Sequence, residues 1–135
     1  RNTFVVLVNK DDQLLFNGEL GEINLLKERA KEFLSNPNNL DNLPEKMTKD
    51  IPLLGTVEVS KGVISLQNDR GTSYEMYLMV QNELTAAVNE LRDEMAKTKF
   101  GKAYVDCSEA QREAIDKAIP IAISEAEPKN IGGNK

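Results

Sequence analysis

Apolar residues at the start of the chain fall into two short runs separated by polar turn formers. Residues 4–8 are too few for a helix, rich in β-branched side chains and apolar at every position, which suits a central strand or one covered on both faces. Residues 9–12 are polar, and a second, mostly apolar run at residues 13–17 stops at Gly18. The pattern predicts a β-hairpin.

The hydrophobic period changes after Glu22. From Ile23 to Leu34 apolar residues recur at three- and four-residue spacing with charged residues between them, which predicts an amphipathic helix that ends near Ser35. Residues 36–56 then carry prolines, several asparagines and scattered charge. We expect them to form a long inserted loop.

A further strand is predicted at residues 62–68, and residues 56–60 are a candidate partner for it. Thr72 and Glu75 have the spacing of a capping box, in which each side chain accepts a hydrogen bond from the other residue's backbone N–H. The spacing therefore predicts that a helix begins at this point.

The helix that follows is the longest of the chain. Its apolar stripe runs from Tyr77 to Met95 at helical spacing, and two lysines followed by Gly101 signal its end. A stripe on the order of 35 Å long exceeds what a small sheet covers. We expect most of the stripe to be core and part of it to face a partner.

The last part of the chain repeats the capping signal. Ser108 and Gln111 have capping-box spacing, and Pro120 must end the short helix that they begin. A final strand is predicted at residues 121–124, and residues 126–135 are expected to be a flexible tail. The expected fold is a single two-layer α+β domain over residues 1–135, in the order β-hairpin, helix, strand, long helix, short helix, C-terminal strand.

The predicted final strand is the candidate interaction site. Its residues Ile121, Ala122, Ile123 and Ser124 alternate between larger and smaller side chains, and we expect the strand to lie at a sheet edge. An edge has unpaired N–H and C=O groups, which pair across a dimer axis or with a partner's extended segment. The alternative is that the strand only completes its own sheet.

Composition and charge narrow the function. With 135 residues, 40% of them hydrophobic and 29% charged, the chain is suited to one globular domain. Its formal charge of -5 opposes a general nucleic-acid role, because phosphate binding requires clustered Lys and Arg. We expect no nucleic-acid partner.

The chain offers little catalytic chemistry. It has no histidine, so the commonest general base and zinc ligand are missing, and it has neither a Walker phosphate loop nor a GxGxxG turn. Cys107 has no histidine to activate it, and Asp11 with Asp12 fits a solvated turn better than a calcium loop. We expect no enzymatic activity and no catalytic, cofactor-binding or metal-binding residue.

Two segments resemble the periplasmic domain of the ExbD/TolR family. In residues 5–19 a strand, a polar turn with aspartate, a second strand and the ending Asn17, Gly18, Glu19 follow the start of that domain. In residues 64–74 an apolar strand is followed by Asp69 and by Tyr74, where the family has an aspartate and a tyrosine that opens the second helix. The insert at residues 36–56 and the long second helix depart from the family pattern.

The resemblance implies a partner-binding role in a Gram-negative cell envelope. Such proteins are anchored in the inner membrane by an N-terminal helix and act with an ExbB/TolQ-type channel on TonB or TolA. Their periplasmic domain dimerises and engages the partner. The proton-linked aspartate lies in that helix, so no residue here inherits its role. Because the sequence begins at Arg1 without methionine, we expect a fragment of a longer protein.

Two functions are therefore carried forward. The leading one is a periplasmic coupling module of a proton-motive-force-driven complex of the TonB-ExbB-ExbD type, which supports transport across the outer membrane. The alternative is a periplasmic domain that binds a small molecule or a peptide, with Asp69 as a candidate acid. An apolar helix encoded upstream would favour the first function, and a cleaved signal peptide would favour the second.

Overall fold

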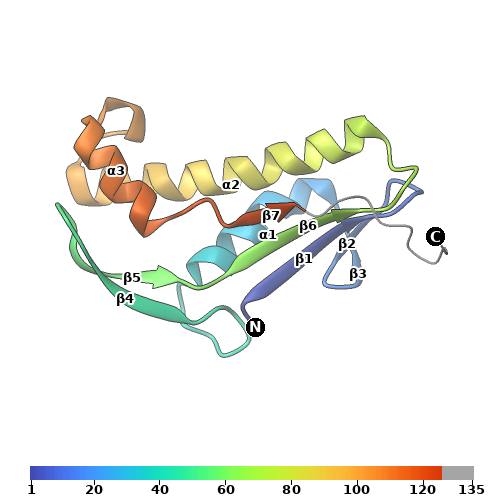
Figure 1. Cartoon of the computed structure of the whole chain (residues 1–135), viewed down its shortest axis with the longest axis horizontal. Helices are drawn as coiled ribbons and strands as arrows, with labels where there is room; N and C mark the ends of the chain where they lie inside the picture. Colours follow the sequence, from blue (N-terminus) through green and yellow to red (C-terminus); the bar gives the residue numbers. More distant parts are fainter. Residues whose placement is uncertain (126–135) are drawn as a thin grey trace.

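The computed structural model describes residues 1–125, so the tail expected at residues 126–135 lies outside the described part. Three α-helices and seven strands are present in that part (Figure 1). The helices are α1 (Ile23–Ser35), α2 (Tyr74–Phe100) and α3 (Glu109–Ala118), with a short 3₁₀ turn, η1 (Tyr104–Asp106), before α3. The strands are β1 (Thr3–Val8), β2 (Leu14–Phe16), β3 (Glu19–Gly21), β4 (Lys46–Ile51), β5 (Gly55–Ser60), β6 (Val63–Asn68) and β7 (Ile123–Glu125).

Five of these strands form one mixed sheet in the order β3-β2-β1-β6-β7. The expected N-terminal hairpin is confirmed, because β1 and β2 pair antiparallel with Val6 opposite Phe16. On its other side β1 pairs parallel with β6, and β6 pairs parallel with β7. The central position of β1 explains its apolar residues: Val6 and Val8 are fully buried, while Val5 and Leu7 on the other face are only partly buried.

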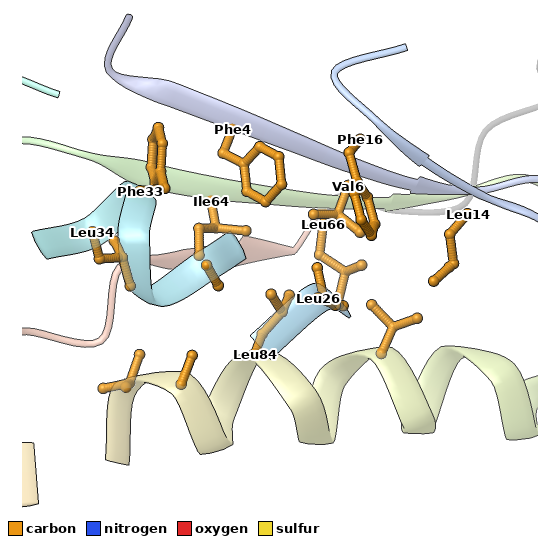
Figure 2. Packing of buried hydrophobic residues seen from close by; sticks show 14 of the residues in the cluster. Phe4, Val6, Leu14, Phe16, Leu26, Phe33, Leu34, Ile64, Leu66 and Leu84 are labelled. Carbon is orange, nitrogen blue, oxygen red and sulfur yellow. The ribbon is translucent and has the colours of Figure 1, made fainter. Parts of the chain in front are cut away.

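The main core lies between this sheet and the helices α1 and α2, which gives the two-layer α+β fold expected from the sequence (Figure 1). Figure 2 shows Ile64 and Leu66 from β6 pointing toward the helices, where they meet Leu26 of α1 and Leu84 of α2. All four side chains are fully buried. Burial of an aliphatic side chain of this size contributes about 1.5–3 kcal/mol, so the sheet and the two helices stabilise one another.

The C-terminal half of α2 extends beyond the sheet and is covered by the chain's own α3 and η1 (Figure 1). A separate buried cluster is formed by Ala96 of α2, Ile115 of α3 and Cys107, which lies between η1 and α3. No position of the stripe from Tyr77 to Met95 is exposed. Tyr77, Leu91 and Met95 are only half-buried, so the expectation that part of the stripe faces a partner stays a prediction. Cys107 is a buried packing residue.

The predicted loop at residues 36–56 is wrong in its second half, where β4 forms. β4 pairs antiparallel with β5, so residues 56–60 do not pair with β6 as predicted. The two strands form a separate ribbon in which Ile51 and Val59 pack on Ala114 and Ala118 of α3. Of the six residues of β4 only Ile51 is buried, so the strand lacks the alternation that predicts a half-buried strand.

The cap of α3 is the predicted one, whereas the cap of α2 differs from the prediction. Ser108 Oγ accepts from the Gln111 N–H at 3.1 Å and Gln111 Oε1 accepts from the Ser108 N–H at 2.8 Å, which confirms the second capping box. At α2 the cap is Ser73, whose Oγ accepts from the Met76 N–H at 3.0 Å. Thr72 instead donates its hydroxyl to the carbonyl oxygen of Val8 at 3.1 Å, which ties the start of α2 to β1.

The first half of the insert is organised by Asn36. This residue is fully buried and ends α1 in the left-handed conformation, with φ of 40°. Its side-chain oxygen accepts from the Leu40 N–H at 2.8 Å, and its amide donates to the carbonyl oxygens of Leu40 and Pro44 at 3.2 and 3.0 Å. Residues 36–44 therefore form an ordered loop that is fixed to the end of α1.

Candidate partner-binding edge

The last strand lies at an edge of the sheet, as expected, but two residues later than predicted. β7 begins at Ile123, and within residues 1–125 it is paired only with β6, with Ile64 opposite Ile123. Ile121 precedes the strand and is 68% exposed, while the Ala122 carbonyl oxygen still accepts from the Ile64 N–H at 2.7 Å. Of the four candidate residues, Ile123 and Ser124 lie in the strand, and Ile121 and Ala122 form the segment that leads into it.

The parallel pairing fixes which backbone groups of β7 face outward. Ile64 of β6 pairs with the two residues that flank Ile123. Its N–H donates to the Ala122 carbonyl oxygen, and in a parallel ladder its carbonyl oxygen accepts from the Ser124 N–H. The N–H and C=O of Ile123 therefore point away from β6, as do those of Glu125. This outer row is the kind of backbone template to which another strand pairs.

Glu125 attaches the end of β7 to α2. Its carboxylate accepts a hydrogen bond from the Tyr77 hydroxyl at 2.8 Å and a second from the Gln81 amide. Burial and, after it, the hydrogen bond to Glu125 raise the pKa of Tyr77 to about 12 from 10.0. The folded state therefore holds the Tyr77 proton more tightly than the unfolded chain does.

Stability should consequently fall in alkaline solution. The contribution of the Tyr77 proton is complete below about pH 10 and is lost as the pH rises through about 12, because in this window the unfolded state binds fewer protons than the folded one. Tyr77→Phe removes the titrating group. We expect the difference in unfolding free energy between wild type and Tyr77→Phe to shrink across this window in urea denaturation. An equal difference at about pH 9 and about pH 11.5 would contradict this assignment.

A small apolar cavity lies beside the start of β7. It has a volume of about 190 Å³, and its lining includes Leu91 and Met95 of α2, Pro120 and Ala122. Recognition by strand addition combines backbone pairing with pockets for alternate side chains. The cavity was not predicted from the sequence, because the residues that line it come from distant parts of the chain.

The family-motif residues Asn17, Gly18 and Glu19 form a tight turn. Asn17 and Gly18 have φ of 51° and 90°, and Phe16 pairs with Glu19, as in a two-residue type I′ hairpin, for which Asn-Gly is the preferred sequence. The Asn17 side-chain oxygen also accepts from the Val5 N–H at 2.8 Å. The geometry of the turn therefore accounts for Asn17 and Gly18 without a partner or ligand.

The two downstream motif residues do not join the turn in a common site. Asp69 follows β6 and is 5% exposed, whereas Tyr74 opens α2 and is 75% exposed. The turn joins β2 to β3 at one edge of the sheet, and β7 forms the opposite edge. The role of Asp69 as a candidate acid stays a prediction.

Residues 1–125 contain no group of three or more His, Cys, Asp or Glu side chains placed to bind a metal ion. In the same part of the chain no helix combines the length and the apolar character that crossing a bilayer requires. Neither a scan against protein-family models nor a search of curated proteins returns a match to this chain. The ExbD/TolR resemblance therefore rests on the sequence motifs and on the order of the elements.

Proposed function

We propose that this chain is a periplasmic coupling module of an inner-membrane complex of the TonB-ExbB-ExbD type, which uses the proton-motive force to support transport across the outer membrane. The observation that carries the proposal is the open outer edge of β7, with the backbone of Ile123 facing outward. The order of the hairpin, α1, β6 and α2 agrees with the family resemblance. The module acts by binding, without catalysis or a cofactor.

The partners follow from the same edge. A second copy of the chain pairs its β7 across a two-fold axis, or a TonB/TolA-type protein adds an extended segment to β7 and places an apolar side chain in the cavity beside Pro120. An ExbB/TolQ-type channel binds the full-length protein in the membrane. Both uses of the edge need the outward N–H of Ile123.

Ile123→Pro tests the edge directly. Proline removes the outward N–H and places its ring where a partner strand would lie, while both groups that pair with β6 belong to Ala122 and Ser124. We expect the variant to lose self-association and binding to a TonB/TolA-type periplasmic segment by at least about tenfold, since several backbone hydrogen bonds are lost together. Sedimentation equilibrium and isothermal titration calorimetry measure the two effects.

Ile123→Ala is the matched control, because it removes the side chain and keeps the N–H. It should associate more strongly than Ile123→Pro, and circular dichroism should show that both variants are folded. If the proline variant associates and binds as well as the alanine variant, β7 is not the interaction edge.

The cellular part of the proposal is tested with the full-length protein. It should fractionate with the inner membrane, co-purify with an ExbB/TolQ-type channel protein, and expose this domain to protease added to spheroplasts. A soluble protein released with the periplasmic contents would instead favour the alternative, a small-molecule or peptide-binding domain. The cavity of about 190 Å³ beside β7 is the observation that supports that alternative.

A further inference from the structure

A second hollow lies on the side of the molecule where β1 begins, between β1, α1 and the loop that follows α1. It has a volume of about 400 Å³, within the range of roughly 300–1,000 Å³ that small-molecule sites occupy. The rings of Phe4 and Phe33, 5.4 Å apart between centroids, form part of its wall (Figure 2). Leu40, also in the wall, is 45% exposed. Because Phe4 and Phe33 are themselves buried, Leu40 and the half-buried Leu43 supply the apolar surface that the hollow offers to a ligand.

One cation in this hollow, Arg29, is positioned by aromatic rings. The guanidinium of Arg29 lies 5.7 Å from the Phe4 ring centroid and 5.5 Å from that of Phe16, so two aromatic rings hold it in place. Arg29 forms no ion pair with any of residues 1–125. Arg1, in the same hollow, differs, because it is bound to the Glu45 carboxylate at 3.5 Å and to a backbone oxygen at 2.7 Å. Arg29 therefore has donors available to a ligand.

We propose that this hollow binds a monocarboxylate that carries a small apolar group. The guanidinium fork matches a carboxylate in two parallel hydrogen bonds, and the apolar wall receives the rest of the ligand. Glu32 also lines the hollow, one helical turn from Arg29, and its negative charge opposes a doubly charged anion such as a phosphate. The carboxylate belongs to a free small acid or to the C-terminus of a peptide. This site does not depend on the proposed function, because β6 lies between β7 and the strand β1 that lines the hollow.

Nuclear magnetic resonance titration of the ¹⁵N-labelled chain tests the site. The probes are 3-phenylpropionate, its carboxamide, an acetylated Gly-Gly-Phe peptide with a free C-terminus, and the same peptide amidated. We expect the acids to shift the Arg29 Nε–H signal and the backbone signals of Phe33 and Leu40, and the amides to leave them unchanged. Binding of phenylpropionate alone identifies a free acid as the ligand, and preference for the peptide acid identifies a C-terminus.

Three variants locate the binding. Arg29→Gln should weaken it about 10- to 100-fold, the usual effect of losing hydrogen bonds to a charged group. Glu32→Gln should strengthen it several-fold, because it removes the repulsive charge. Arg70→Gln is the matched control: it removes the same charge from an exposed arginine outside the hollow and should not change binding.

Any of three outcomes would overturn the proposal. One is that the acids cause no shifts at about 10 mM, where even a weak site with a millimolar dissociation constant is mostly filled. A second is that the carboxamides shift the same signals as strongly. A third is that Arg29→Gln binds the acids as well as Arg70→Gln does.

Discussion

Truncation of Leu66 to alanine should lower the free energy of unfolding by about 3–4 kcal/mol. Leu66 is fully buried in β6, which is hydrogen-bonded to β1 on one side and to β7 on the other. Because both neighbours hold the strand in place, the surrounding structure relaxes little and a cavity remains. Urea denaturation followed by circular dichroism measures the loss.

Leu20→Ala is the matched control for this experiment. It is the same substitution in the same sheet, but Leu20 lies in the edge strand β3 and is 71% exposed. We expect a change within about 0.5 kcal/mol. A loss of equal size at Leu20 and Leu66 would show that the core does not lie between the sheet and the two helices.

Asn36→Ala should cost about 2–4 kcal/mol, although it removes only one polar side chain. The substitution leaves the Leu40 N–H and the Pro44 carbonyl without their side-chain partner and places alanine in a left-handed conformation. The same denaturation measurement detects it. Release of residues 36–44 should also appear as faster hydrogen exchange of the Leu40 N–H.

Two further variants separate the stability lost through backbone strain from the stability lost with the side-chain hydrogen bonds. Asn36→Gly tolerates the left-handed conformation, so its loss reports only the hydrogen bonds. Asn39→Ala places alanine at an exposed residue with φ of 53° and should cost about 1 kcal/mol for the backbone alone. If Asn36→Ala costs no more than Asn39→Ala, the buried amide does not hold the loop.

The sequence predicted the elements whose apolar positions face the main core. In α1, Leu26 and Phe33 have helical spacing and are both buried. The apolar positions in the sequence therefore mark the face of the helix that the fold buries. β4 gives no such signal, because its ribbon has one buried residue in the strand and its stability depends on α3. A strand that is stabilised mainly by its partner strand and a distant helix leaves little periodicity in its own sequence.

The turn at Asn17 and Gly18 shows a different limit. Asn-Gly between apolar residues is a strong hairpin signal, yet sequence analysis used it as the end of a strand and as a family motif. The strand after it, β3, has only three residues and exposes Glu19 and Leu20, so nothing in its pattern indicated a strand. The strand pairing itself shows the turn's role.

The candidate site was predictable in part. The edge position of the final strand followed from its place at the end of the element order. Its start did not, because Ile121 and Ala122 alternate just as Ile123 and Ser124 do, and only the pairing with β6 distinguishes them. The hollow at Arg29 was not predictable, because its walls come from β1, the turn after β2, α1 and the loop after α1.

The parallel pairing of β7 with β6 also sets an order for folding. The chain must pass through α2, η1 and α3 between these two strands, so their pairing closes a long loop and bears its entropic cost. By contrast, the hairpin of β1 and β2 forms from residues that are close in sequence. We therefore expect the hairpin to form before β7 docks, and until β7 docks, β6 is an edge strand that is paired with β1 alone among residues 1–125.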